Sequence, residues 1–129
     1  MEPAILKQGE YLIATIQSAL SDADLSQLRY SLVEQVGRYR SKAVIVDVTS
    51  MDVMDSYATR TMRDIAHMVG LRGAETVIVG IHPDVAIAMV QLGLTLEGVA
   101  TALDLEEGLA YLSRRAESGR NPSHRSRRP

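Results

Sequence analysis

Apolar residues along this chain follow two alternating periods, one typical of strands and one of helices. Short uncharged runs rich in valine and isoleucine predict strands that are covered on both faces of a sheet. Between these runs, apolar residues recur every three or four positions, which is the spacing of an amphipathic helix. The predicted strands lie at 4–6, 11–16, 43–48, 76–80 and 99–102, and the predicted helices at 25–36, 56–69, 83–92 and 104–112.

Turn and cap residues indicate where these elements begin and end. Gly9 separates the first two strands as a hairpin turn, and Ser21 with an acid three residues later is the signature of a helix start. Gly37 and Gly70 are expected to end helices, and Pro83 to open one. The resulting order, ββαβαβαβα, predicts an α/β fold: a mixed, mostly parallel sheet of about five strands with four helices.

Length and composition point to one domain. The chain has 129 residues, of which 46% are hydrophobic and 23% charged, as in ordinary globular domains. We expect the domain to span 1–116 and the Arg/Ser/Pro-rich segment 117–129 to be a disordered tail. The absence of cysteine excludes disulfide scaffolds and thiol nucleophiles. The chain starts without a signal-peptide pattern and has no long apolar run, so we expect a cytoplasmic protein without membrane contact.

The charge distribution disfavours nucleic acid as a partner. The formal net charge is −2, but four arginines lie in the tail, which leaves ten basic against fifteen acidic residues in 1–116. Nucleic-acid binders need basic surfaces to neutralise phosphates and often use aromatic rings for stacking. This chain has five tyrosines but neither phenylalanine nor tryptophan.

Motifs for cofactors and metals are missing. Neither the dinucleotide-binding glycine pattern nor a P-loop occurs, so the glycines are interpreted as turns and helix stops. His67, His82 and His124 lack neighbours at metal-ligand spacing. We therefore predict no cofactor, no metal and no catalytic residue.

One segment carries candidate chemistry: 46–57, where a predicted buried strand ends and a helix begins. Open α/β sheets place their sites at the carboxyl ends of strands. Ser56 follows Asp55 at the helix start, where such residues ordinarily cap the helix. Asp47, Asp52 and Asp55 could instead form an acidic or metal-binding trio of a small enzyme. The intervening apolar residues could be core anchors or a protein-contact patch; they are Met51, Val53 and Met54.

This strand–Asp–Thr/Ser–loop–Asp–Ser pattern resembles the phosphorylatable loop of STAS-domain anti-sigma-factor antagonists. Residues 80–86 and 101–109, together with Tyr57 where sporulation-type members tend to have glycine, look most like the RsbS-type scaffold subunits of the bacterial stressosome. The resemblance spans 4–116 and matches the predicted element order. An ordinary stand-alone anti-anti-sigma factor that binds an anti-sigma-factor kinase is the alternative.

The resemblance implies a role for each part of this segment. Ser56 is expected to be phosphorylated by an RsbT-type serine kinase and dephosphorylated by an RsbX-type phosphatase. The subunit is expected to form homo- and hetero-oligomers with RsbR-type STAS paralogues. The partner-binding residues are expected to be Asp52, Val53, Met54, Asp55, Ser56 and Tyr57.

Physical chemistry supports a switch at this position. A helix N-terminus tolerates a phosphate, which adds roughly 1.5–2 negative charges. Like charge concentrated beside Asp52 and Asp55 would weaken a partner docked there. The hypothesis is that unmodified Ser56 holds the kinase and phosphorylated Ser56 releases it.

Overall fold

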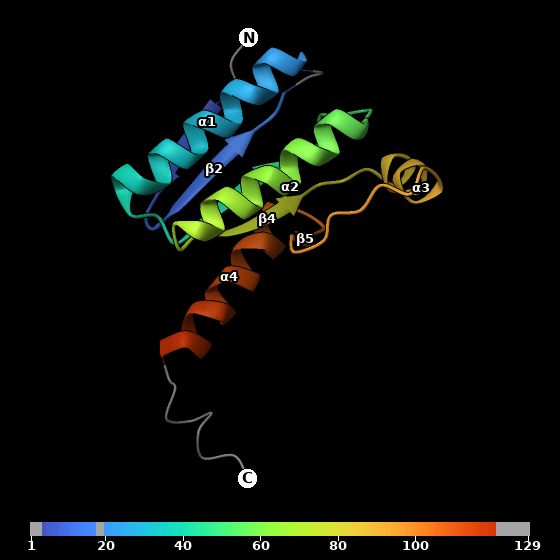
Figure 1. Cartoon of the computed structure of the whole chain (residues 1–129). Coiled ribbons are helices and arrows are strands. Elements are labelled where there is room, and N and C mark those ends of the chain that lie inside the picture. Colours follow the sequence, from blue (N-terminus) through green and yellow to red (C-terminus); the bar gives the residue numbers. More distant parts are fainter. Residues whose placement is uncertain (1–3, 18–19, 121–129) are drawn as a thin grey trace.

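The computed structural model describes residues 4–17 and 20–120 and confirms the predicted α/β order (Figure 1). The elements are β1 (Ala4–Gln8), β2 (Tyr11–Thr15), α1 (Asp22–Tyr39), β3 (Ala43–Asp47), α2 (Ser56–Leu71), β4 (Glu75–Val79), α3 (Pro83–Gln91), β5 (Ala100–Ala102) and α4 (Leu105–Arg120). The five strands form one sheet in the order β1-β2-β3-β4-β5. Only the β1–β2 hairpin is antiparallel, and the other three pairings are parallel.

The sheet is covered on both faces, and each face has its own core. On one face, α1 and α2 pack over alternate residues of β2, β3 and β4, with Leu12, Val44 and Ile78 fully buried. On the other face, α4 covers the strands through Leu112, against Ile45 and Val77. Successive side chains along a strand point to opposite faces of the sheet. Each buried strand therefore contributes residues to both cores.

Close packing of α4 depends on a glycine. A Cβ at Gly108 would stand 2.8 Å from the side chain of Val79, so the helix could not approach the sheet with a larger residue there. On the opposite face, α1 and α2 are joined by an ion pair between Arg29 and Asp64, 3.4 Å apart. The glycine thus lets α4 approach the sheet closely, and the ion pair joins the two helices of the opposite layer.

Several predicted element ends are wrong by a few residues. Helix α1 continues past Gly37 to Tyr39, and α2 continues past Gly70 to Leu71. The left-handed residues after these helices are Arg40, with φ 51°, and Gly73, with φ 88°. A glycine within a helix therefore need not end it.

The last helix also differs from its predicted extent. Helix α4 runs to Arg120, so its backbone continues four residues beyond the expected domain boundary at 116. The rest of the predicted tail, 121–129, lies outside the described residues. Among the helices that are described, none is long and apolar enough to cross a membrane.

Candidate functional site

Ser56 is the first residue of α2, at the carboxyl end of the parallel strand β3. It is exposed, and its hydroxyl makes no hydrogen bond with the described residues. The N-cap is the preceding residue: Asp55 accepts a hydrogen bond at Oδ1 from the backbone N–H of Ala58, at 2.8 Å. Because Asp55 caps the helix, the Ser56 hydroxyl is not needed for that purpose.

The loop between β3 and α2 is fixed at its start. The Asp47 carboxylate accepts hydrogen bonds from the backbone N–H and the hydroxyl of Thr49, at 2.9 and 2.6 Å. Gly80, with φ 83°, lies so close to Thr49 that a Cβ would overlap its side chain. The His82 ring contacts the Thr49 carbonyl oxygen from the same neighbouring loop. The β4–α3 loop thus holds the first part of the Ser56 loop in place.

The apolar residues of the loop are divided between core and surface. Met51 and Met54 are 5% and 4% exposed and belong to the core under α1 and α2. Val53 is 71% exposed. Met54 was expected either to anchor the core or to contact a partner; its side chain is buried in the core, and a partner contact of this residue stays a prediction. Tyr57 is half-buried and packs against the same core, so it covers the core edge while part of it stays accessible.

The acidic residues of the loop have separate environments. Asp47 holds Thr49, Asp55 caps α2, and Asp52 is exposed on the loop. Across the described part of the chain, no three His, Asp or Glu side chains lie close enough to hold a metal ion. The trio of Asp47, Asp52 and Asp55 is therefore not brought together as a metal site. His67 is exposed on α2, and His124 lies outside the described residues.

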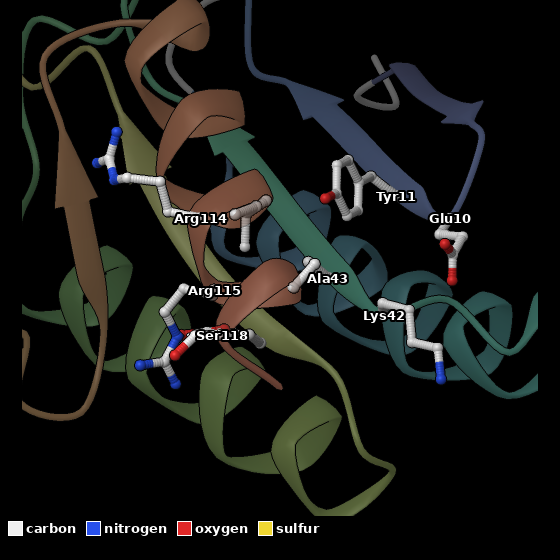
Figure 2. Close-up of a pocket in the computed structure, with 10 residues that line it drawn as sticks. Glu10, Tyr11, Lys42, Ala43, Arg114, Arg115 and Ser118 are labelled. Carbon is white, nitrogen blue, oxygen red and sulfur yellow. Dashed lines mark hydrogen bonds and ion pairs between the residues drawn. The ribbon is translucent and has the colours of Figure 1, made fainter. Parts of the chain in front are cut away.

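A groove at the opposite end of the sheet from Ser56 was not anticipated from the sequence. It is a groove of about 720 Å³ between the C-terminal part of α4 and the starts of β2, β3 and β4 (Figure 2). Tyr11, Ala43 and Leu112 line its apolar part. Its charged lining is mixed: Lys42, Arg114 and Arg115 are basic, and Glu10 and Glu75 are acidic. These residues come from segments of the chain as far apart as Tyr11 and Arg114, so no local motif signals the groove.

Comparison with known proteins agrees with this fold. The family model described as the STAS domain matches residues 2–108. The RsbT co-antagonist protein RsbRA of Bacillus subtilis (strain 168) is 32% identical over 79 residues, which are 61% of this chain and 29% of that protein. The chain thus spans less than a third of the length of this curated relative.

Two solved structures match over nearly their whole length. A serine-to-glutamate variant of RsbS from Moorella thermoacetica has 32% identity and a TM-score of 0.78, covering 91% of this chain and 99% of that one. The second is a chain from a structure of the stressosome, described as a signal integration and transduction hub. It has 32% identity and a TM-score of 0.72, and the match covers 88% of the present chain and 98% of the stressosome chain. The resemblance found in the sequence is confirmed. This chain belongs to the STAS-domain family and, over nearly its whole described length, is similar to the stressosome protein RsbS.

Proposed function

We propose that this chain is a non-enzymatic regulator that holds an RsbT-type serine kinase while Ser56 is unmodified and releases it once Ser56 is phosphorylated. The observation that carries the proposal is the exposed Ser56 hydroxyl at the first position of α2. STAS-domain antagonists are generally regulators rather than enzymes. The similarity to RsbS over 99% of that chain supports the same class of function here.

The local structure can accept a phosphate on Ser56 without loss of the helix. Because Asp55 caps the helix, a phosphate can be added to the Ser56 oxygen without breaking a hydrogen bond that stabilises α2. The backbone N–H groups of Ser56 and Tyr57 have no acceptor among the described residues and lie at the positive end of the α2 dipole. A negative group there gains about 0.3–1 kcal/mol from the dipole. The phosphorylated protein should therefore remain folded.

The surroundings of Ser56 explain why phosphorylation would release a partner. The exposed surface combines the apolar Val53 with two carboxylates, those of Asp52 and Asp55. A phosphate buried in an interface here must lose its water and lie beside like charge, which disfavours the bound state. A cost of about 1.4–3 kcal/mol corresponds to a loss of affinity of roughly 10- to 150-fold. That range is sufficient for a switch.

The proposal extends to the other partners implied by the resemblance. RsbR-type paralogues would join the chain in a large assembly, and an RsbX-type phosphatase would restore the unmodified serine. The stand-alone anti-anti-sigma factor, the alternative interpretation of the sequence, uses the same serine chemistry without such an assembly. Measuring the particle mass of the chain mixed with an RsbR-type paralogue distinguishes the scaffold proposal from this alternative. Only the scaffold proposal predicts very large particles.

The test combines phosphorylation with capture of the kinase. The full chain is incubated with an RsbT-type kinase and ATP, the modified residue is mapped by mass spectrometry, and the kinase retained on the immobilised chain is measured. Wild type should carry phosphate on Ser56 and lose the kinase after ATP addition. Ser56→Ala should retain it with and without ATP, because no phosphate can form. Ser56→Asp should bind less kinase than wild type before ATP is added.

Ser50→Ala is the matched control. Ser50 is an exposed serine in the same loop, six residues before Ser56. This variant should be phosphorylated and should release the kinase as wild type does. Release of the kinase from Ser56→Ala on ATP addition, or phosphate mapped to Ser50 instead of Ser56, would refute the proposal.

A further inference from the structure

The outer side of α2 carries an arginine one helical turn after Ser56. Ser56, Arg60 and His67 are exposed, and the core residues Met62 and Ile65 lie on the opposite side of the helix. Residues four positions apart in a helix are neighbours on one face, with about 5–6 Å between their Cβ atoms. Arg60 is therefore the neighbour of Ser56 on the exposed face of α2.

Arg60 is a cation without a counterion. Its guanidinium forms no ion pair with the described residues. Asp64, four positions further along α2, is bound by Arg29 of α1 at 3.4 Å. The Asp55 carboxylate is used as the cap of the helix. The two acids on either side of Arg60 along the chain thus have other partners, and the guanidinium is free to bind an anion that is added at Ser56.

The other charged groups near this face do not replace Arg60. Asp52 is exposed in the loop before α2 and forms no ion pair with the described residues. As an anion of one charge, it competes weakly for Arg60 with a phosphate of roughly 1.5–2 charges. Arg63 and His67 lie about 10 and 16 Å from Ser56 along the helix axis, against about 6 Å for Arg60.

We infer that Arg60 is the intramolecular receptor for a phosphate on Ser56: its guanidinium binds the phosphate oxygens across one turn of α2. Arginine pairs with phosphate through parallel N–H···O hydrogen bonds. An anion four residues before a cation is also the favourable order within a helix, since it agrees with the helix dipole. Arg60 is thus a positioning residue for the modified serine. The inference rests on the proposed function, because it concerns a chain that is phosphorylated at Ser56.

This pairing changes what the surface offers to a partner in its two states. In the unmodified chain, Arg60 is available to an acidic side chain of a partner. In the phosphorylated chain, the phosphate occupies the guanidinium, which compensates only one of the roughly two negative charges. Phosphorylation therefore adds negative charge and withdraws a positive contact at the same time. Binding of the cation also favours the dianion, so it lowers the second pKa of the phosphate, which is ordinarily about 6.

The test uses the full chain with phosphoserine incorporated in place of Ser56 during translation, so it requires no kinase. The pH dependence of the phosphorus NMR signal gives the second pKa of the phosphate. This pKa should be higher in Arg60→Gln than in wild type, because loss of the bound cation disfavours the dianion. Arg60→Lys should give an intermediate pKa, since an ammonium keeps the charge but not the paired hydrogen bonds.

Arg63→Gln is the matched control. Arg63 lies on the same face of α2, further from Ser56, and like Arg60 it forms no ion pair with the described residues. The substitution therefore removes the same charge at a distance where salt screens most of the interaction. The rise in the phosphate pKa should be less than about half of the rise in Arg60→Gln.

Thermal unfolding measures the same contact independently. Arg60→Gln is compared with wild type in the unmodified and in the phosphorylated chain. The drop in Tm that this substitution causes should be larger by at least about 1 °C in the phosphorylated chain, because only there does Arg60 have an ion pair to lose. Arg60 is exposed, so the variant should fold, and circular dichroism checks this.

Any of three results would overturn the inference. The phosphate pKa could be the same in wild type and Arg60→Gln, the rises in Arg60→Gln and Arg63→Gln could be equal, or the drop in Tm could be the same in both chains. Equal rises would mean that the phosphate responds to the charge of the whole face and not to a bound guanidinium. All three are distinct from failure of the proposed function, which would appear as release of the kinase from Ser56→Ala.

Discussion

Single residues decide how accurately the Ser56 loop is positioned, and Gly80 is the clearest example. Its φ of 83° lies in the left-handed region that only glycine adopts without strain. Its missing side chain leaves the space that Thr49 occupies, and Thr49 is held in turn by Asp47. A residue outside the loop thus determines where the loop begins.

Gly80→Ala should lower the free energy of unfolding by about 1–3 kcal/mol, since alanine would be strained at this φ and would displace Thr49. Urea denaturation measures the change. Gly70→Ala is the control, because Gly70 lies in helix α2 with open space where a Cβ would stand. This variant should have a free energy of unfolding about 0.5–1 kcal/mol higher than that of wild type. Equal stability of the two variants would contradict the strain at Gly80.

At the scale of elements, two neighbouring residues at the start of α2 have different roles: Asp55 caps the helix, and Ser56 is the proposed phosphorylation site. Asp55 binds the backbone of Ala58 through its side chain, and its carbonyl oxygen accepts from the N–H of Thr59, at 2.9 Å. Ser56, one position later, makes no comparable bond with the described residues. The helix is therefore stabilised by the residue beside the modifiable hydroxyl and not by the hydroxyl itself.

Asp55→Ala should destabilise the protein by about 1 kcal/mol, within a usual range of 0.5–2 kcal/mol for N-caps. The same denaturation experiment on Asp52→Ala should show a change of less than about 0.5 kcal/mol, because Asp52 is exposed and makes no cap. If the two substitutions have the same effect, Asp55 does not stabilise α2 through its side chain.

On the scale of the whole molecule, Glu75 connects the last helix to the sheet. Its carboxylate accepts from the Tyr111 hydroxyl at 3.0 Å and from Arg115 at 3.1 Å, across at least 36 positions of sequence. Burial, and then the hydrogen bond to Glu75, raises the pKa of Tyr111 above its ordinary value. The stability that this shift contributes is present below the unfolded-state pKa, near 10. It is lost as pH rises through the folded-state pKa.

Tyr111→Phe removes this titration. The difference in unfolding free energy between wild type and Tyr111→Phe should therefore shrink above pH ~10, as measured by denaturant unfolding at a series of pH values. A constant difference over this pH series would show that the pKa of Tyr111 is not raised.

Local patterns in the sequence were sufficient for the element order, the fold class and the position of Ser56 at a helix start. Strand and helix periodicity depend on neighbouring residues, and so does the Asp-Ser pair at the end of a buried strand. Exact helix ends were harder to predict, because Gly37 and Gly70 are tolerated within helices. The sequence also left open which of Met51, Val53 and Met54 was buried, since all three are apolar.

What the sequence determined by itself was therefore the alternation of strands and helices and the place of the candidate serine. Only the tertiary structure decided that Met54 is buried while Val53 is exposed, that Gly80 and His82 hold the Ser56 loop, and that Tyr11, Lys42 and Arg114 line one groove. The physical reason is that these features depend on contacts between residues far apart in the chain. Such contacts exist only after the parallel strands have paired and brought distant loops to the same end of the sheet.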